Sequence, residues 1–255
     1  MIIDMTTSSD DFIAAILSNQ PKQLGANLGQ EEMLTTLVEQ IKNLSNETTK
    51  VVSFIGGAGS GKSTLSKLLI EHLEQAGASA DSISTDDFNK GDRAWRWENF
   101  EDKPGVDPIG KYDFELLNKK VKAIRQNTDL DKTITVPMYT QATGLAIDAG
   151  EENYTHRIGK LDVLIVEGDF HPVNNPDLVV YLHVPDAQRL QNRVDRDVVH
   201  RGGDHEKTTA SFNFRHQVQH LPHTLPVAKE ADILLDVKPD KAGWQYDVYR
   251  LGKLL

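Results

Sequence analysis

The chain has 255 residues, enough for one large α/β domain or two small ones with a substantial buried core. It contains no cysteine, which excludes disulfide bonds, thiolate metal sites and a cysteine nucleophile and is what we expect of a cytoplasmic protein. The net charge of −10, from 38 acidic and 28 basic side chains, argues against a broad nucleic-acid-binding face. Any polyanion that the protein binds should therefore be small and held at a local basic site.

Residues 1–48 are polar and are predicted to form a helical N-terminal extension. Their apolar residues recur at helical spacing, at Met33, Leu34, Leu37, Val38, Ile41 and Leu44. We interpret this stripe as a helix docked on the outside of the following domain. The start of the chain lacks the pattern of a signal peptide, and no apolar run approaches the roughly 20 residues that cross a bilayer. We therefore expect no membrane anchor.

Residues 49–255 are predicted to form one α/β domain, because short apolar runs alternate with amphipathic segments. This pattern is typical of a mainly parallel sheet flanked by helices. Five strands are predicted, at VVSFI (51–55), SADSIS (79–84), LDVLIVEG (161–168), LVVYLHV (178–184) and ADILLDV (231–237).

Two segments depart from this alternation of strands and helices. Residues 132–160 alternate apolar and polar side chains around a glycine-containing turn, which predicts a hairpin at the edge of the sheet. Residues 89–112 are rich in glycine, proline, aromatic and charged residues and are too long for a simple connection. Long irregular insertions of this kind are often substrate loops.

A phosphate-binding loop follows the first predicted strand. Residues 56–63, GGAGSGKS, match G-x-x-x-x-G-K-[ST] between a predicted strand and a predicted helix. The glycines let backbone N–H groups converge on phosphate oxygens, Lys62 reaches the β and γ phosphates, and Ser63 offers its hydroxyl to Mg²⁺. The predicted nucleotide-binding residues are Gly57, Ala58, Gly59, Ser60, Gly61, Lys62, Ser63 and Thr64. The chain has no N-K-x-D guanine motif, which argues against a GTPase.

Carboxylates follow two further strands. Asp86 and Asp87 come after the second strand, at the end of the sheet where ligands of open α/β sheets bind. One of the two could orient or accept the proton of an acceptor hydroxyl, or both could cap a turn. Glu167 ends the third strand, where its carboxylate could hold Mg²⁺ beside the phosphate loop or simply be solvated.

Arginines recur on one face of the helix predicted after the fourth strand, at Arg189, Arg193 and Arg196, with Arg201 just beyond. We interpret residues 189–206 as a mobile lid whose guanidiniums cover the transferring phosphoryl group, with a hinge at Gly202 and Gly203. The alternative for any one arginine is a surface ion pair, such as Arg193 with Asp197.

The motifs GGAGSGKST, TDDF, PMY, IVEG and RVDRDVVHRG together resemble the uridine kinase and phosphoribulokinase group of P-loop kinases, over about residues 50–237. The resemblance implies a nucleoside-monophosphate-kinase-like fold, with ATP and Mg²⁺ as cofactors and an alcohol as the phosphoryl acceptor. It implies catalytic roles for Asp86 as the base and for Lys62, Arg196 and Arg201, ATP binding by Arg193, Mg²⁺ binding by Ser63 and Glu167, and acceptor binding by Asp86, Tyr139 and Arg196.

The motifs do not decide the chemical identity of the acceptor, because the chain departs from the uridine kinase pattern. Its lid reads RGGD where RGRD is usual, and a few residues after the P-x-Y tyrosine it has Thr143 and Gly144 where a histidine is usual. A nucleoside is the expected acceptor, and the alternatives are a non-nucleoside alcohol, such as pantothenate, glycerate or a sugar phosphate, or a catalytically weak regulatory ATP-binding protein. We expect no nucleic-acid polymer or membrane as a partner, while a homo-oligomer is compatible with the sequence.

Overall fold

The computed structural model describes residues 8–45, 47–100, 103, 105–139, 155–240 and 243–252. The strands are β1 (Lys22–Leu28), β2 (Lys50–Gly56), β3 (Ala80–Ser84), β4 (Ile134–Pro137), β5 (Thr155–Ile158), β6 (Val163–Gly168), β7 (Leu178–His183), β8 (Ile233–Asp240) and β9 (Gly243–Arg250). The α-helices are α1 (Ser9–Leu17), α2 (Gln30–Lys42), α3 (Lys62–Gln75), α4 (Arg93–Asn99), α5 (Phe114–Arg125), α6 (Asp186–Val194) and α7 (His205–Arg215). The described residues also include 3-10 helices and π-helices. The 3-10 helices are η1 (Thr85–Phe88), η2 (Pro108–Lys111) and η6 (Leu225–Lys229), and the π-helices are η4 (Asp195–Val199) and η5 (His216–Thr224).

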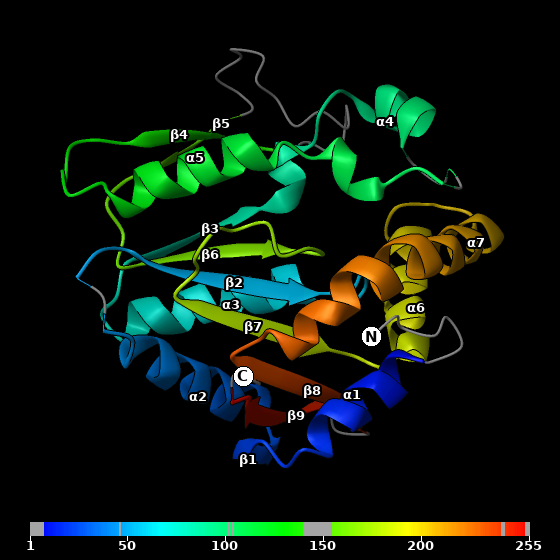
Figure 1. The fold of residues 1–255 in the computed structure, drawn as a ribbon, viewed down its shortest axis with the longest axis horizontal. Helices are drawn as coiled ribbons and strands as arrows, with labels where there is room; N and C mark the ends of the chain where they lie inside the picture. The colour runs from blue at the N-terminus through cyan, green and yellow to red at the C-terminus, as the bar shows by residue number, and fades with distance from the viewer. Residues whose placement is uncertain are drawn as a thin grey trace.

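The main sheet follows the order β1-β9-β8-β7-β2-β6-β3 (Figure 1). Five neighbouring strands of this sheet pair in parallel, in the order β8, β7, β2, β6 and β3. They are the five strands that the sequence predicts. The prediction of five strands is nevertheless wrong in number, because β9 and β1 add two antiparallel strands at the β8 edge. The edge strand β1 has no buried residue and two irregularities in its pairing, so its sequence lacks the apolar alternation that reveals a strand.

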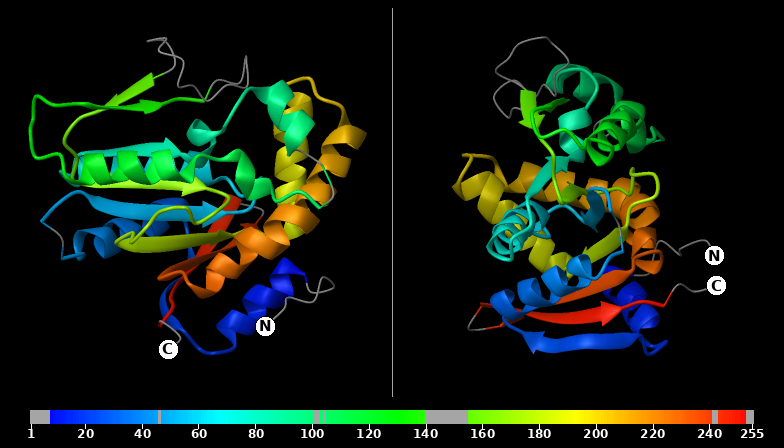
Figure 2. Two further views of the ribbon diagram at one scale, coloured as in Figure 1. Left: turned by 45° about the horizontal axis from the view of Figure 1, so that its top comes forward. Right: turned by 90° about the vertical axis from the view of Figure 1, so that its left-hand side faces the viewer.

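Helices cover both faces of the sheet (Figure 2). Side chains of β2 alternate between the faces: Val52 and Phe54 pack with α2 and α3, while Ile55 packs with α1 and the η5–η6 segment. Next to that second cluster, α5 packs on β3 and β6 around Ile83 and Leu164. Because the central strands are buried on both faces, they read as continuous apolar runs in the sequence.

The N-terminal segment differs from the expected helical extension in two ways. It contributes β1 to the sheet, and its apolar stripe on α2 belongs to the same cluster as Val52 and Phe54. Leu37 is fully buried there. The helix at 30–42 is present as predicted, but it covers the sheet together with α3 and forms part of the main core.

Replacing Leu37 with alanine should lower the free energy of unfolding by about 2–5 kcal/mol, because it opens a cavity in this core. Thr35→Ala, at an exposed position of the same helix, is the matched control and should change it by less than about 0.5 kcal/mol. Denaturant titration of both variants measures the difference. Equal stability of the two variants would mean that α2 is not part of the core.

The predicted hairpin is present but forms a sheet of its own. Strands β4 and β5 pair antiparallel in register from Ile134 with Ile158 to Pro137 with Thr155. They lie beside β3, where His156 Nε2 is 2.7 Å from a carboxylate oxygen of Asp81, and they do not join the main sheet. The turn between them, residues 140–154, lies outside the described residues.

Among the described residues, no helix is both long and apolar enough to span a membrane.

Candidate active site

The sheet brings three sequence motifs to one edge. Strand β6 lies between β2 and β3, and its Glu167 is in register with Phe54 of β2 on one side and Ser84 of β3 on the other. Because all three strands are parallel, the phosphate loop after β2, the acid loop after β3 and the end of β6 meet at their carboxyl ends. The parallel pairing therefore places the predicted nucleotide and acceptor residues next to one another.

The phosphate loop has the backbone that anion binding requires. Gly59 and Gly61 have φ angles of 84° and 87°, a region that favours glycine, and Gly61 immediately precedes α3. Lys62 is buried, and its Nζ donates to Gly57 O at 3.1 Å and to Asp169 Oδ1 at 2.7 Å. Burial raises the pKa of Asp169, but the charge and hydrogen bond of Lys62 outweigh it and hold that pKa below its ordinary value. Asp169 therefore stays charged and positions the lysine.

Ser63 and Glu167 form a pair of oxygen ligands beside the loop. The Ser63 hydroxyl donates to Glu167 Oε1 at 3.0 Å. Burial raises the pKa of Glu167, against the opposing effect of Lys62 and the Ser63 hydrogen bond. A nearby cation stabilises the charged form of a carboxylate that burial disfavours, and Mg²⁺ prefers such hard oxygen ligands. The donor set therefore fits the predicted Mg²⁺ site.

Asp86 and Asp87 point in different directions. Asp87 accepts hydrogen bonds from the backbone N–H groups of Tyr139 (2.7 Å) and Ser84 (2.8 Å) and thereby fixes the loop. Asp86 is exposed at the site, where it accepts a hydrogen bond from the Tyr112 hydroxyl at 3.3 Å. Burial, followed by the charge of Asp86, raises the pKa of Tyr112 well above its ordinary value, so that Tyr112 remains a donor. Of the two acids, Asp86 is the one available to an acceptor hydroxyl.

Three of the four arginines in the predicted lid form no hydrogen bond with the phosphate loop in this structure. Arg193 (3.4 Å), Arg196 (2.8 Å) and Arg201 (3.1 Å) all form ion pairs with Asp197. Partial burial raises the pKa of Asp197, but the hydrogen bond and charge of Arg196 outweigh it, so the carboxylate remains charged. The three guanidiniums are therefore gathered around one carboxylate in this structure.

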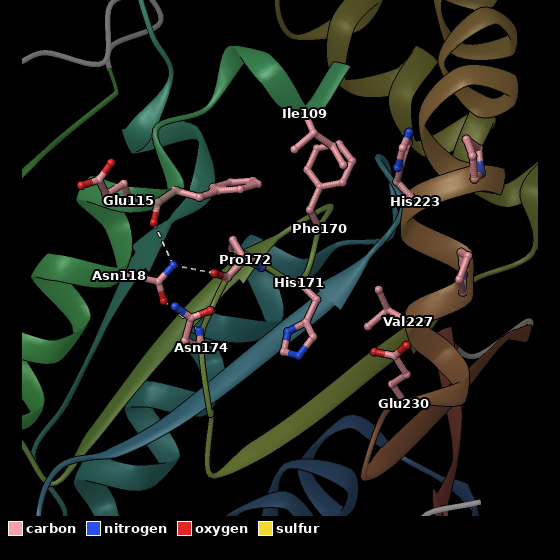
Figure 3. A pocket seen from close by; sticks show the side chains of 13 residues that line it. Ile109, Glu115, Asn118, Phe170, His171, Pro172, Asn174, His223, Val227 and Glu230 are labelled. Carbon is pink, nitrogen blue, oxygen red and sulfur yellow. Dashed lines mark hydrogen bonds between the residues drawn. The ribbon is translucent and has the colours of Figure 1, made fainter. Parts of the chain in front are cut away.

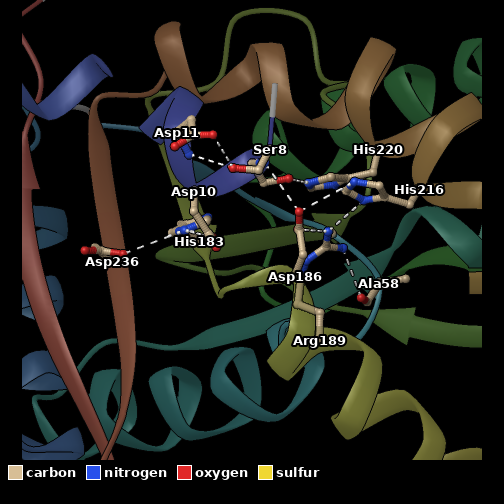
Figure 4. A network of polar contacts seen from close by, with 12 residues as sticks. Ser8, Asp10, Asp11, Ala58, His183, Asp186, Arg189, His216, His220 and Asp236 are labelled. Atoms are coloured by element: carbon tan, nitrogen blue, oxygen red, sulfur yellow. Dashed lines mark hydrogen bonds and ion pairs between the residues drawn. The ribbon is translucent and has the colours of Figure 1, made fainter. Parts of the chain in front are cut away.

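Arg189, the first arginine of the predicted lid, has no individual site role in the sequence prediction, and in the structure it contacts the phosphate loop (Figure 4). Arg189 of α6 is buried, forms an ion pair with Asp186 at 2.5 Å and donates from Nη1 to Ala58 O at 3.3 Å. His220 of η5 packs against the same side of the loop, and its Nε2 lies 3.0 Å from the Ser9 hydroxyl of α1. The N-terminal helix is thereby connected to the back of the phosphate loop.

Gly57 is one of the loop residues against which the Arg189 and His220 side chains pack. A Cβ atom at Gly57 would lie 2.2 Å from Arg189 Nη1 and 2.8 Å from His220 Nδ1. We expect Gly57→Ala to weaken ATP binding at least about tenfold, because the loop or both buried side chains must move. Gly159→Ala is the control, since a Cβ there has no neighbour within 4 Å. Titration with a fluorescent ATP analogue measures both variants, and unchanged affinity in Gly57→Ala would refute the tight contact.

A pocket of about 690 Å³ opens next to the site, between the start of α5, the β6–β7 loop and the η5–η6 segment (Figure 3). None of the predicted site residues lines it. Its Phe170 packs edge-on against Tyr112, with ring centroids 5.5 Å apart, and so separates it from the Asp86 side. Asn118 fixes the wall by donating to Pro172 O at 2.7 Å. The pocket is distinct from the phosphate loop.

The family model described as "Phosphoribulokinase / Uridine kinase family" matches residues 51–242. The chain belongs to this family. Among curated relatives, a uridine kinase from Macrococcus caseolyticus is 28% identical over 192 residues, covering 73% of this chain and 87% of the relative. A phosphoribulokinase from Synechocystis sp. is 25% identical over 197 residues, covering 75% of this chain and 54% of the relative. This member of the phosphoribulokinase / uridine kinase family is therefore a P-loop kinase with an alcohol as acceptor.

Solved structures confirm the fold of this family member. A D-glycerate 3-kinase from Cryptococcus neoformans var. grubii superposes with a TM-score of 0.56 at 17% identity, covering 85% of this chain and 98% of that one. A candidate fructose transport system kinase from Silicibacter sp. TM1040 gives a TM-score of 0.59 at 22% identity, covering 77% of this chain and 98% of that one. The expected P-loop kinase fold is thus confirmed.

Proposed function

We propose that the protein transfers the γ-phosphoryl group of ATP to a hydroxyl of a small molecule, with Asp86 as the general base. The observation that carries this proposal is the meeting of Lys62, the Ser63–Glu167 pair and Asp86 at one end of the sheet. The exposed carboxylate of Asp86, beside a phosphate-binding loop, suits an acceptor hydroxyl better than a purely structural role.

In the proposed reaction, Asp86 takes the proton of the acceptor hydroxyl as its oxygen attacks the γ phosphorus. The bond from that phosphorus to the β–γ bridging oxygen breaks, and ADP leaves with the electron pair. Backbone N–H groups of residues 57–63 and Lys62 would hold the phosphates. Ser63 and Glu167 would hold Mg²⁺, which would supply positive charge to offset the negative charge of the phosphates. Arg193, Arg196 and Arg201, which pair with Asp197 in this structure, would stabilise the transferring group.

Two acceptor classes remain candidates. The similarity to uridine kinases supports a nucleoside, with Tyr139 as a contact to it. The second candidate, a non-nucleoside alcohol that carries a negative charge, is favoured by a buried arginine on the acceptor side, Arg96.

The test is acceptor-dependent release of ADP from Mg²⁺-ATP, measured with nucleosides, pantothenate, glycerate and sugar phosphates. At least one acceptor is expected to stimulate release and to become a phosphate ester. If ATP binds and none of these compounds stimulates release, a regulatory ATP-binding protein replaces the kinase proposal.

A further inference from the structure

The segment between β3 and α5 contributes a buried cation to the acceptor side of the site. Arg96 of α4 is only 4% exposed. Its Nη1 donates to Gly91 O at 3.0 Å, and its guanidinium lies 5.6 Å from the ring centroid of Tyr139. Among the described residues, no carboxylate forms an ion pair with it. A buried guanidinium with no counter-charge is unfavourable, so this arrangement suits an anionic ligand.

Arg96 is close to the proposed base. The Tyr139 ring that it faces belongs to the residue whose N–H binds Asp87, the neighbour of Asp86. Residues 89 and 112 form a β-bridge that carries Tyr112 to Asp86, so the same insertion supplies both Arg96 and the hydroxyl that binds the base. The insertion therefore places the Tyr112 hydroxyl against Asp86 and the Arg96 guanidinium against the Tyr139 ring.

Two further cations face this region. Burial lowers the pKa of Arg215, the last residue of α7. The negative charge of Asp86 opposes this effect, and the positive charge of Arg96 adds to it. Lys111 is buried with its Nζ 5.2 Å from the ring centroid of Tyr112. Arg96, Lys111 and Arg215 therefore lie in the same part of the molecule as two carboxylates, Asp86 and Asp169.

We infer that the acceptor is an alcohol that also carries an anionic group, a carboxylate or a phosphate, and that Arg96 binds this group while Asp86 faces the hydroxyl. The inference rests on the proposed phosphoryl transfer and narrows its acceptor. A neutral nucleoside would leave the Arg96 guanidinium without an ion-pair partner among the described residues. A carboxylate or phosphate accepts two parallel N–H bonds from such a group.

Matched pairs of probes test the inference by binding, without turnover. The protein is saturated with Mg²⁺ and a non-hydrolysable ATP analogue, and calorimetry compares ribose 5-phosphate with ribose and glycerate with glycerol, with uridine as the nucleoside. At least one anionic probe should bind at least about tenfold more tightly than its neutral counterpart, the scale of a charge-assisted bidentate contact. The pair that shows the difference distinguishes phosphate from carboxylate.

Arg96→Gln should remove this preference, while Arg93→Gln, at an exposed position of the same helix, should retain it. Thermal unfolding of both variants shows whether Arg96→Gln still folds, and Arg96→Lys should restore part of the preference if the charge is what matters. The inference is overturned if uridine or another neutral probe binds as tightly as every anionic probe, or if folded Arg96→Gln keeps the preference. Tight binding of an anionic probe that is never phosphorylated would instead refute the kinase proposal and leave the anion site standing.

Discussion

Replacing Lys62 with alanine is expected to weaken ATP binding and to lower phosphoryl transfer by roughly 10²–10³-fold, the effect of removing one preorganised charge from a transferring group. The buried ammonium of Lys62 is held 2.7 Å from Asp169 and 3.1 Å from Gly57 O, at the mouth of the phosphate loop. Nucleotide titration and initial rates of ADP release measure the two effects.

The matched control for Lys62 is Lys67→Ala, an exposed lysine one turn further along α3. It removes the same charge from the chain and should leave both binding and rate unchanged. Because Lys62→Ala also leaves Asp169 without its cation, thermal unfolding must show that the variant is folded. Normal transfer in folded Lys62→Ala would contradict the role of the phosphate loop.

Replacing Asp86 with asparagine should lower turnover by roughly 10²–10⁴-fold and leave ATP affinity nearly unchanged. The amide keeps the shape of the carboxylate and can still accept from Tyr112, but it cannot take a proton from the acceptor. Steady-state rates at saturating acceptor, together with nucleotide titration, separate the two quantities.

Asp131→Asn, an exposed acid in the loop before β4, controls for the loss of one negative charge and should have the wild-type rate. An unchanged turnover in Asp86→Asn would remove Asp86 from the role of base. A large loss of ATP affinity in that variant would mean that Asp86 acts on the nucleotide side of the site.

The sequence predicts the central sheet and the residues that gather at its end because both depend on local patterns. Buried parallel strands read as apolar runs, and each motif directly follows its strand. Lys62, Ser63, Glu167 and Asp86 therefore meet once those strands pair. Strand β1 is not predicted, because an edge strand without buried residues lacks the alternation of apolar and polar side chains that indicates a strand. Its place depends on pairing with β9, more than 200 residues along the chain.

The unpredicted site residues depend on contacts between distant segments. Tyr112 reaches Asp86 through the bridge between residues 89 and 112, and no spacing in the sequence indicates that bridge. Arg189 shares a helical face with the lid arginines, so the sequence could not separate the arginine that holds the phosphate loop from those that pair with Asp197. The alternative that the sequence offered for one of them, an ion pair of Arg193 with Asp197, is confirmed.

The most direct test of phosphoryl transfer to a small molecule is a single-turnover experiment with ATP labelled in its γ-phosphoryl group. The protein is mixed with Mg²⁺, labelled ATP and the acceptor that gives the highest rate of ADP release, and the products are separated. The label is predicted in an organic phosphate ester, with none formed by Asp86→Asn in the same time. Label that appears only as inorganic phosphate, or that stays in bound ATP with every acceptor, would contradict transfer to a hydroxyl.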